Sequence, residues 1–125
     1  MNNKLYKIFK KLESNSLSEG EMDFLLSYVF KVAKVYLTYK YKSSVLLDKK
    51  VTTIDELAIN TTANLFYKTS KEQTRFYKVL SSQKENIYHE KDVCYYIYRV
   101  VWEEVDRIIM SEMLKWNLVP LEGYK

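Results

Sequence analysis

Along residues 22–37, apolar side chains recur every three or four positions, and lysines fall on the opposite side of the pattern. This spacing is typical of an amphipathic helix that packs one face onto a core. Ser18 and Glu21 precede the pattern and are three residues apart, which predicts a capping box at its start. The predicted buried stripe consists of Met22, Leu25, Leu26, Val29, Ala33, Tyr36 and Leu37.

A second capping box, Thr53 with Glu56, predicts the start of another helix in residues 51–66. Apolar residues form two neighbouring stripes there, so we expect a central helix with neighbours on two sides. Thr61 and Thr62 are poor helix-interior residues, and we expect their hydroxyls to bond carbonyls of the preceding turn. The first stripe is Ile54, Leu57, Ala58, Thr61 and Leu65, and the second is Ile59, Ala63 and Phe66.

The remaining segments give shorter or weaker patterns. Residues 1–16 predict a short basic amphipathic helix, which packing onto the core explains better than contact with a membrane or nucleic acid. The stretch 43–53 is a predicted break between the two helices. Residues 76–80 indicate a short helix followed by an exposed loop, and a last helix is expected from an Asp92 cap through Trp116, with 117–125 as a tail.

Composition agrees with a helical fold. The 125 residues include two glycines and one proline, and so lack most of the residues that tight β-turns require. The length suits one domain. We therefore predict an all-α protein, a compact bundle of four to five helices in a single domain over 1–125, with the main bundle in 18–116.

The sequence offers little chemistry. His89 falls in the predicted loop, and Cys94 sits among apolar and aromatic neighbours that favour burial. One cysteine and one histidine do not make a conventional zinc site, and two glycines do not build a phosphate-binding loop. We expect no enzymatic activity, no catalytic residue, no metal and no cofactor. The lack of an apolar run of about 18 residues predicts no membrane partner and a cytoplasmic location.

Charge and tyrosine content leave two readings open. Residues 1–50 hold 10 Lys and Arg against 5 Asp and Glu, and twelve tyrosines often alternate with lysines. Unpaired bases stack on tyrosine rings while lysines hold phosphates, so the mixture suits single-stranded nucleic acid. Solvated lysines and half-buried or interfacial tyrosines explain it equally well.

The order of motifs resembles the second conserved region of bacterial sigma factors, especially the extracytoplasmic-function type. Asp55, Glu56 and Leu57 with Leu65 and Phe66 match the pattern of its acidic helix, and Arg99 with Val100 matches the start of its later helix. Glu103 and Glu104 depart from it, since a helix that reads DNA favours basic residues there. The helix-turn-helix domain usual in that family does not follow within these residues.

The resemblance implies docking on the clamp coiled coil of RNA polymerase core, with single-stranded promoter DNA as a further partner. By position, Asp55, Glu56, Ile59 and Asn60 would face the polymerase. The alternative is a non-enzymatic helical interaction module or small regulatory subunit with a tyrosine-rich interface. The sequence leaves the oligomeric state open. The candidate nucleic-acid-binding residues are Lys34, Tyr41, Lys42, Tyr67, Lys68, Arg75, Tyr77, Lys78, Arg99 and Trp102.

Overall fold

The computed structural model describes residues 4–12, 17–41, 45–47, 50–67 and 74–116. Within them lie five α-helices, one 3₁₀ turn and a pair of short strands. The helices are α1 (Lys4–Leu12), α2 (Glu19–Tyr41), α3 (Ile54–Phe66), α4 (Arg75–Ser81) and α5 (Glu90–Trp116), and the 3₁₀ turn is η1 (Lys84–Asn86). The predicted all-α bundle is confirmed.

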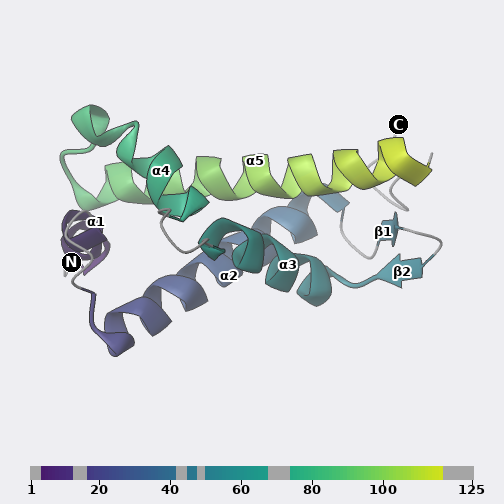
Figure 1. Cartoon of the computed structure of the whole chain (residues 1–125), viewed down its shortest axis with the longest axis horizontal. Coiled ribbons are helices and arrows are strands. Elements are labelled where there is room, and N and C mark those ends of the chain that lie inside the picture. The colour runs from purple at the N-terminus through teal and green to yellow at the C-terminus, as the bar shows by residue number, and fades with distance from the viewer. Residues whose placement is uncertain (1–3, 13–16, 42–44, 48–49, 68–73, 117–125) are drawn as a thin grey trace.

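Three helices form the body of the bundle. α5 runs along the length of the molecule, α2 crosses beside it, and α3 packs against both (Figure 1). α4 lies over α3 and α5. α1 crosses one end of the bundle, where the Leu5 N–H donates to Glu90 Oε2 at 3.1 Å. The predicted tail, 117–125, and part of the predicted 1–16 segment lie outside the described residues.

The predicted stripe of α2 and the first predicted stripe of α3 face the core, although Met22, Leu26, Tyr36 and Ile54 are only half-buried. From α2, Leu25, Val29, Ala33 and Leu37 are buried, and from α3 Leu57, Ala58, Thr61 and Leu65. α5 contributes Ile97, Val100, Val101, Val105 and Ile109. The 3.6-residue period therefore identified correctly the inward side of α2 and the first buried stripe of α3.

The hydrogen bonds at the starts of α2 and α3 are those of the predicted capping boxes. Ser18 Oγ accepts from the Glu21 N–H while Glu21 accepts from the Ser18 N–H, and Thr53 and Glu56 make the same reciprocal pair. Both predicted capping boxes are confirmed. α5 begins at Glu90, before the predicted Asp92 cap. Asp92 lies within the first turn, and its carboxylate accepts hydrogen bonds from the N–H groups of Tyr88 and His89, which precede the helix.

The segment predicted as a simple break contains two short strands. β1 (Val45–Leu47) and β2 (Lys50–Thr52) pair antiparallel, with Leu46 opposite Val51. β1 also contacts α5 (Figure 1). Val45 in β1 and Val51 and Thr52 in β2 are β-branched residues, which favour extended backbone.

Candidate functional site

The outer side of α3 carries the residues that the resemblance assigns to polymerase binding. Asp55, Ile59 and Asn60 are exposed, and Glu56 is half-buried because its carboxylate is held in the cap with Thr53. Ile59 leaves 56% of its surface open. We use the name outer face of α3 for Asp55, Ile59, Asn60, Ala63 and Asn64, all of which are exposed.

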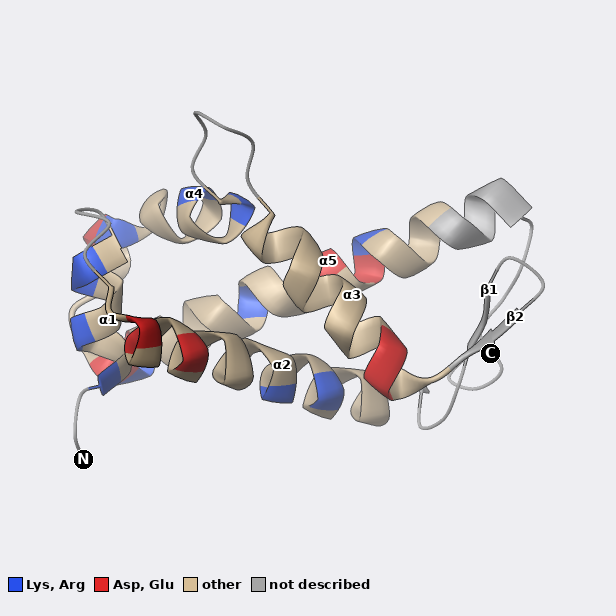
Figure 2. Cartoon of the chain, turned by 60° about the horizontal axis from the view of Figure 1, so that its bottom comes forward, with Lys and Arg blue, Asp and Glu red and all other residues tan. Residues whose placement is uncertain are grey.

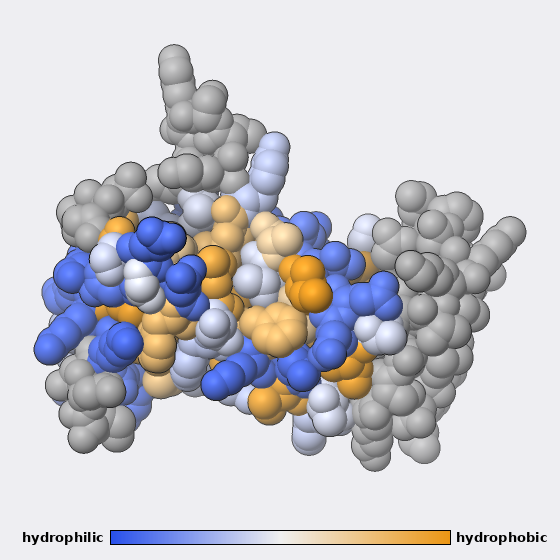
Figure 3. Space-filling view, turned by 90° about the horizontal axis from the view of Figure 1, so that it is seen from below, coloured by the Kyte–Doolittle hydropathy of each residue, from blue (hydrophilic) through white to orange (hydrophobic). Residues whose placement is uncertain are grey.

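This exposure corrects one expectation. The second apolar stripe of α3 was predicted to be covered by a neighbour, but Ile59 and Ala63 are exposed and Phe66 is half-buried against Phe76 of α4. α2, α5 and α4 all contact α3, whose buried residues are Leu57, Ala58, Thr61 and Leu65. Figure 3 shows apolar side chains gathered over the middle of the face that α2 and α3 form, with hydrophilic side chains on either side.

The helix that carries this face is held firmly. Thr61 Oγ1 donates to the Leu57 carbonyl at 2.8 Å, and Thr62 Oγ1 donates to the Ala58 carbonyl at 2.9 Å, as predicted. These bonds satisfy the hydroxyls within α3, so the threonines pack close to neighbouring helices without an unpaired polar group. The outer face is therefore presented from a helix whose opposite side packs into the core.

Lys34, a candidate nucleic-acid contact, instead links two helices. Its Nζ lies 3.1 Å from Asp55 Oδ1, which joins α2 to the start of α3, and it also lies over the Phe30 ring. Both charged side chains remain partly open to solvent, so the pair adds little stability. It sets the charge at one end of the outer face, where Figure 2 shows lysines of α2 beside the acidic start of α3.

Tyr36 and Lys40, from the part of α2 in which lysines and tyrosines alternate, also link two helices. The Tyr36 hydroxyl donates to Asp106 at 2.8 Å, and Lys40 Nζ lies 2.9 Å from the same carboxylate. Burial, followed by the hydrogen bond to Asp106, raises the pKa of Tyr36. This cluster fastens α2 to α5. Tyr41 ends α2 with its side chain outside the described part, and Lys42 and Lys68 also lie outside it.

Arg75 and Glu104 form the tightest charged contact between α4 and α5. Arg75 Nε lies 2.9 Å from Glu104 Oε1, and Arg107 of α5 contacts the same carboxylate through Nε and Nη2. The Glu104 side chain is only 1% exposed, whereas both arginines are about half exposed. The hydrogen bonds that Arg107 donates to Glu104 raise the pKa of Arg107.

This arrangement changes the interpretation of Glu104. From the sequence it appeared as a surface acid that would repel DNA, but it is buried and compensated by two arginines. Arg107 was not among the predicted site residues. The signal available in the sequence was the i, i+3 spacing of Glu104 and Arg107 on α5, which places both on one side of a helix.

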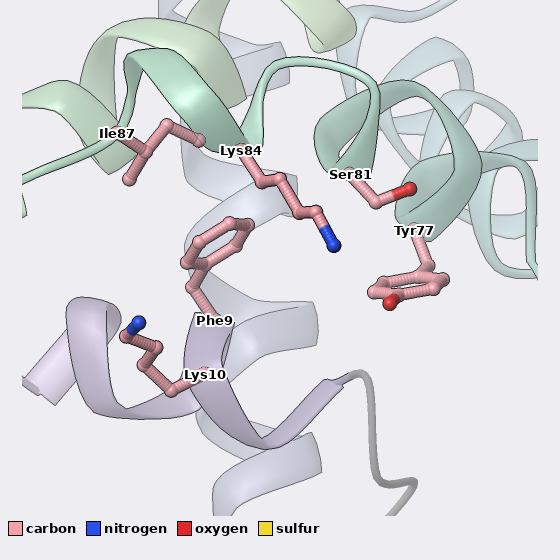
Figure 4. Close-up of a pocket in the computed structure, with 6 residues that line it drawn as sticks. All are labelled: Phe9, Lys10, Tyr77, Ser81, Lys84 and Ile87. Carbon is pink, nitrogen blue, oxygen red and sulfur yellow. The ribbon is translucent and has the colours of Figure 1, made fainter.

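Tyr77 does not present its ring for base stacking. The residue is 9% exposed, and its ring lines a pocket of about 260 Å³ between α1, α4 and the segment around η1. Figure 4 shows Lys84 extending its amine into the space between Phe9 and Tyr77. The 3.6-residue period turns Tyr77 inward with Phe76 and Leu80, so its ring is mostly covered, whereas base stacking requires an open ring face.

The other candidate nucleic-acid residues divide between two sides of the molecule. Tyr67, 69% exposed, ends α3, and Lys78 is exposed on α4. Trp102 instead lies on the α2 side of α5, with its ring 6.1 Å from that of Tyr36, and is half-buried like Arg99. Positions 102 and 104 are separated by about 200° around α5. The structure therefore does not bring Trp102 together with the residues of α4.

His89 is exposed before α5, as expected, whereas Cys94, which was expected to be buried, is half-buried. Burial, followed by the interaction with Cys94, raises the pKa of Tyr28. Among the described residues, no three His, Cys, Asp or Glu side chains gather as a metal site would require. None of the described helices is long and apolar enough to cross a membrane.

Comparisons with known proteins do not assign this chain to a family. No protein-family model, no curated protein and no solved structure matches this chain.

Proposed function

We propose that this chain is a sigma-factor-like transcription module that docks on RNA polymerase core through the outer face of α3. The observation that carries the proposal is the exposure of Ile59 and Ala63 on a capped, central helix. An uncovered apolar centre with a rim of acidic and amide side chains is the usual composition of a protein interface. The motif resemblance supplies the identity of the partner.

The order of elements supports the same proposal. A long helix, a capped acidic helix, a short helix and a second long helix follow one another as α2, α3, α4 and α5. The acidic residues Asp55 and Glu56 lie at the start of α3, where they also favour the positive end of the helix. A basic, apolar surface on the polymerase would complement this face.

Affinity for RNA polymerase core, measured by biolayer interferometry, tests the proposal. We expect Ile59→Ser to weaken binding about tenfold, because it removes the apolar centre of the interface. Met110→Ser is the matched control, since Met110 on α5 is 55% exposed and Ile59 is 56% exposed. Neither change disturbs the core, so both variants should keep the helical content of the wild type.

Equal affinities of the two variants for the polymerase, or no binding by the wild type, would refute the proposal. In that case, concentration-dependent self-association that Ile59→Ser abolishes would favour the alternative of a helical interaction module. Sedimentation velocity of the wild type and of both variants makes this measurement.

Contact with single-stranded promoter DNA is a second candidate activity. The exposed ring of Tyr67, which follows α3, and the exposed Lys78 of α4 support it, since both side chains are open to solvent. A ring that stacks a base contributes about 1–3 kcal/mol. Tyr67→Ala should therefore weaken oligonucleotide binding, whereas Tyr39→Ala, at an exposed tyrosine on α2, should not.

A further inference from the structure

Arg75 and Arg107, here called the arginine pair, come from different helices and meet at one carboxylate oxygen. Oε1 of Glu104 lies 2.9 Å from Arg75 Nε and 3.3 Å from Arg107 Nε, so the two guanidinium groups lie close together. Two cations this close repel each other unless an anion lies between them. Glu104 supplies one negative charge and leaves the cluster with one positive charge in excess.

The excess charge is at the surface. Glu104 is buried, but the side chains of Arg75 and Arg107 are 52% and 51% exposed. The Glu104 carboxylate contacts Nε of Arg75 and accepts hydrogen bonds from Nε and Nη2 of Arg107. A guanidinium carries five N–H donors, so each arginine keeps further donors beyond those that bind Glu104.

The buried carboxylate also fixes the direction of both side chains. A free arginine loses rotamer entropy when it binds an anion, whereas these two are already held by a charge-assisted contact. One arginine would be sufficient to compensate Glu104. The second is therefore available for a ligand without leaving the buried carboxylate unpaired.

Neighbouring charges leave the surface positive. Lys78 is exposed one turn after Arg75 on α4, and Glu103 is exposed one turn before Arg107 on α5. These two charges cancel, and the net charge of the five groups remains +1. Planar guanidinium groups that lie side by side suit the oxygens of a phosphate, which accept bidentate hydrogen bonds.

We propose that the arginine pair is a binding site for a backbone phosphate of single-stranded nucleic acid, held by the donors that Glu104 leaves over. This inference rests on the second candidate activity, contact with single-stranded DNA, and assigns its phosphate contact to Arg107, which the sequence pattern did not indicate. Glu104 then has a positioning role, since it aligns both arginines.

Fluorescence anisotropy with a labelled oligothymidylate, titrated at several salt concentrations, tests the site. Each phosphate contact on a single strand contributes about −0.7 to the slope of log affinity against log salt. Arg107→Gln should therefore flatten the slope by about 0.7 and weaken binding about fivefold at 0.1 M salt. Arg75→Gln should act similarly, and each variant leaves Glu104 with one arginine, so the fold is retained.

Lys91→Gln is the matched control. Lys91 is exposed on the same helix, about 24 Å from Arg107 along its axis, and its replacement removes the same charge. If Arg107→Gln and Lys91→Gln change slope and affinity equally, or if the wild type does not bind the oligonucleotide, the assignment is overturned. Polymerase binding by the wild type and by Ile59→Ser is measured separately, so a failure here does not decide the docking proposal.

Discussion

Glu104 is an acidic residue in the middle of α5, and its burial determines its role. Its side chain is 1% exposed, so its charge requires partners, and Arg75 and Arg107 supply them from two helices. The adjacent Glu103 has the same chemistry but is exposed. Two neighbouring glutamates therefore have different roles, because consecutive helix positions point about 100° apart.

Replacement of these two glutamates should separate the roles. Glu104→Gln keeps the shape but removes the charge that holds both arginines, and should lower the free energy of unfolding by about 2 kcal/mol. Glu103→Gln should change it by less than about 0.5 kcal/mol. Urea denaturation followed by circular dichroism measures both values, and equal values would contradict the role of Glu104 as the buried carboxylate that holds both arginines.

Asp92 predicts a pH dependence at the start of α5. Hydrogen bonds from the N–H groups of Tyr88 and His89 hold the pKa of Asp92 below its usual value of 3.8. A lowered folded-state pKa adds stability above the unfolded pKa, and that stability is lost as the pH falls through the folded value. From about pH 5 to about pH 3, the Tm of the wild type should therefore fall more than that of Asp92→Asn. Parallel Tm curves would refute this role.

At the scale of the element, α3 combines a buried side and an open side within thirteen residues. Leu57, Ala58 and Leu65 face the core, while Ile59 and Ala63 face solvent. A helix apolar over so wide an arc is expected to be enclosed, but here its partners cover one side only. The uncovered side is the part of α3 that a docking partner would reach.

Two truncations of similar size on α3 test this division. Leu57→Ala should cost about 2–5 kcal/mol because Leu57 is 2% exposed and its loss leaves a cavity. Ile59→Ala should change the free energy of unfolding by less than about 0.5 kcal/mol. Thermal or urea denaturation gives both numbers, and a large loss for Ile59→Ala would mean that Ile59 is covered.

At the scale of the whole molecule, the bundle keeps its two proposed binding regions on separate elements. The outer face belongs to α3, whereas the arginine pair belongs to α4 and α5. The ion pair of Lys34 with Asp55 connects the outer face to α2 and not to the arginine pair. We therefore expect the two regions to bind their proposed partners independently.

Independent binding is the expected consequence. Ile59→Ser should leave oligonucleotide affinity within about twofold of the wild type, and Arg107→Gln should leave polymerase affinity within about twofold, because no described contact joins the two regions. Anisotropy and biolayer interferometry on the same protein preparations check both. Loss of both affinities in either variant would indicate one shared surface.

The amino-acid sequence by itself determined the helices, the inward side of α2, the first buried stripe of α3 and two capping boxes, because these depend on spacing within a few residues. It also indicated the threonine bonds of α3. Helical periodicity did not indicate that Ile59 would be uncovered, and the sequence did not indicate that Tyr77 would be buried or that the lysines and tyrosines of α2 would fasten α2 to α3 and α5. Each of these depends on which helix packs on which side. Likewise, Arg75 and Arg107 meet at Glu104 only because α4 lies over α5, a contact between residues far apart in the chain that no local pattern encodes.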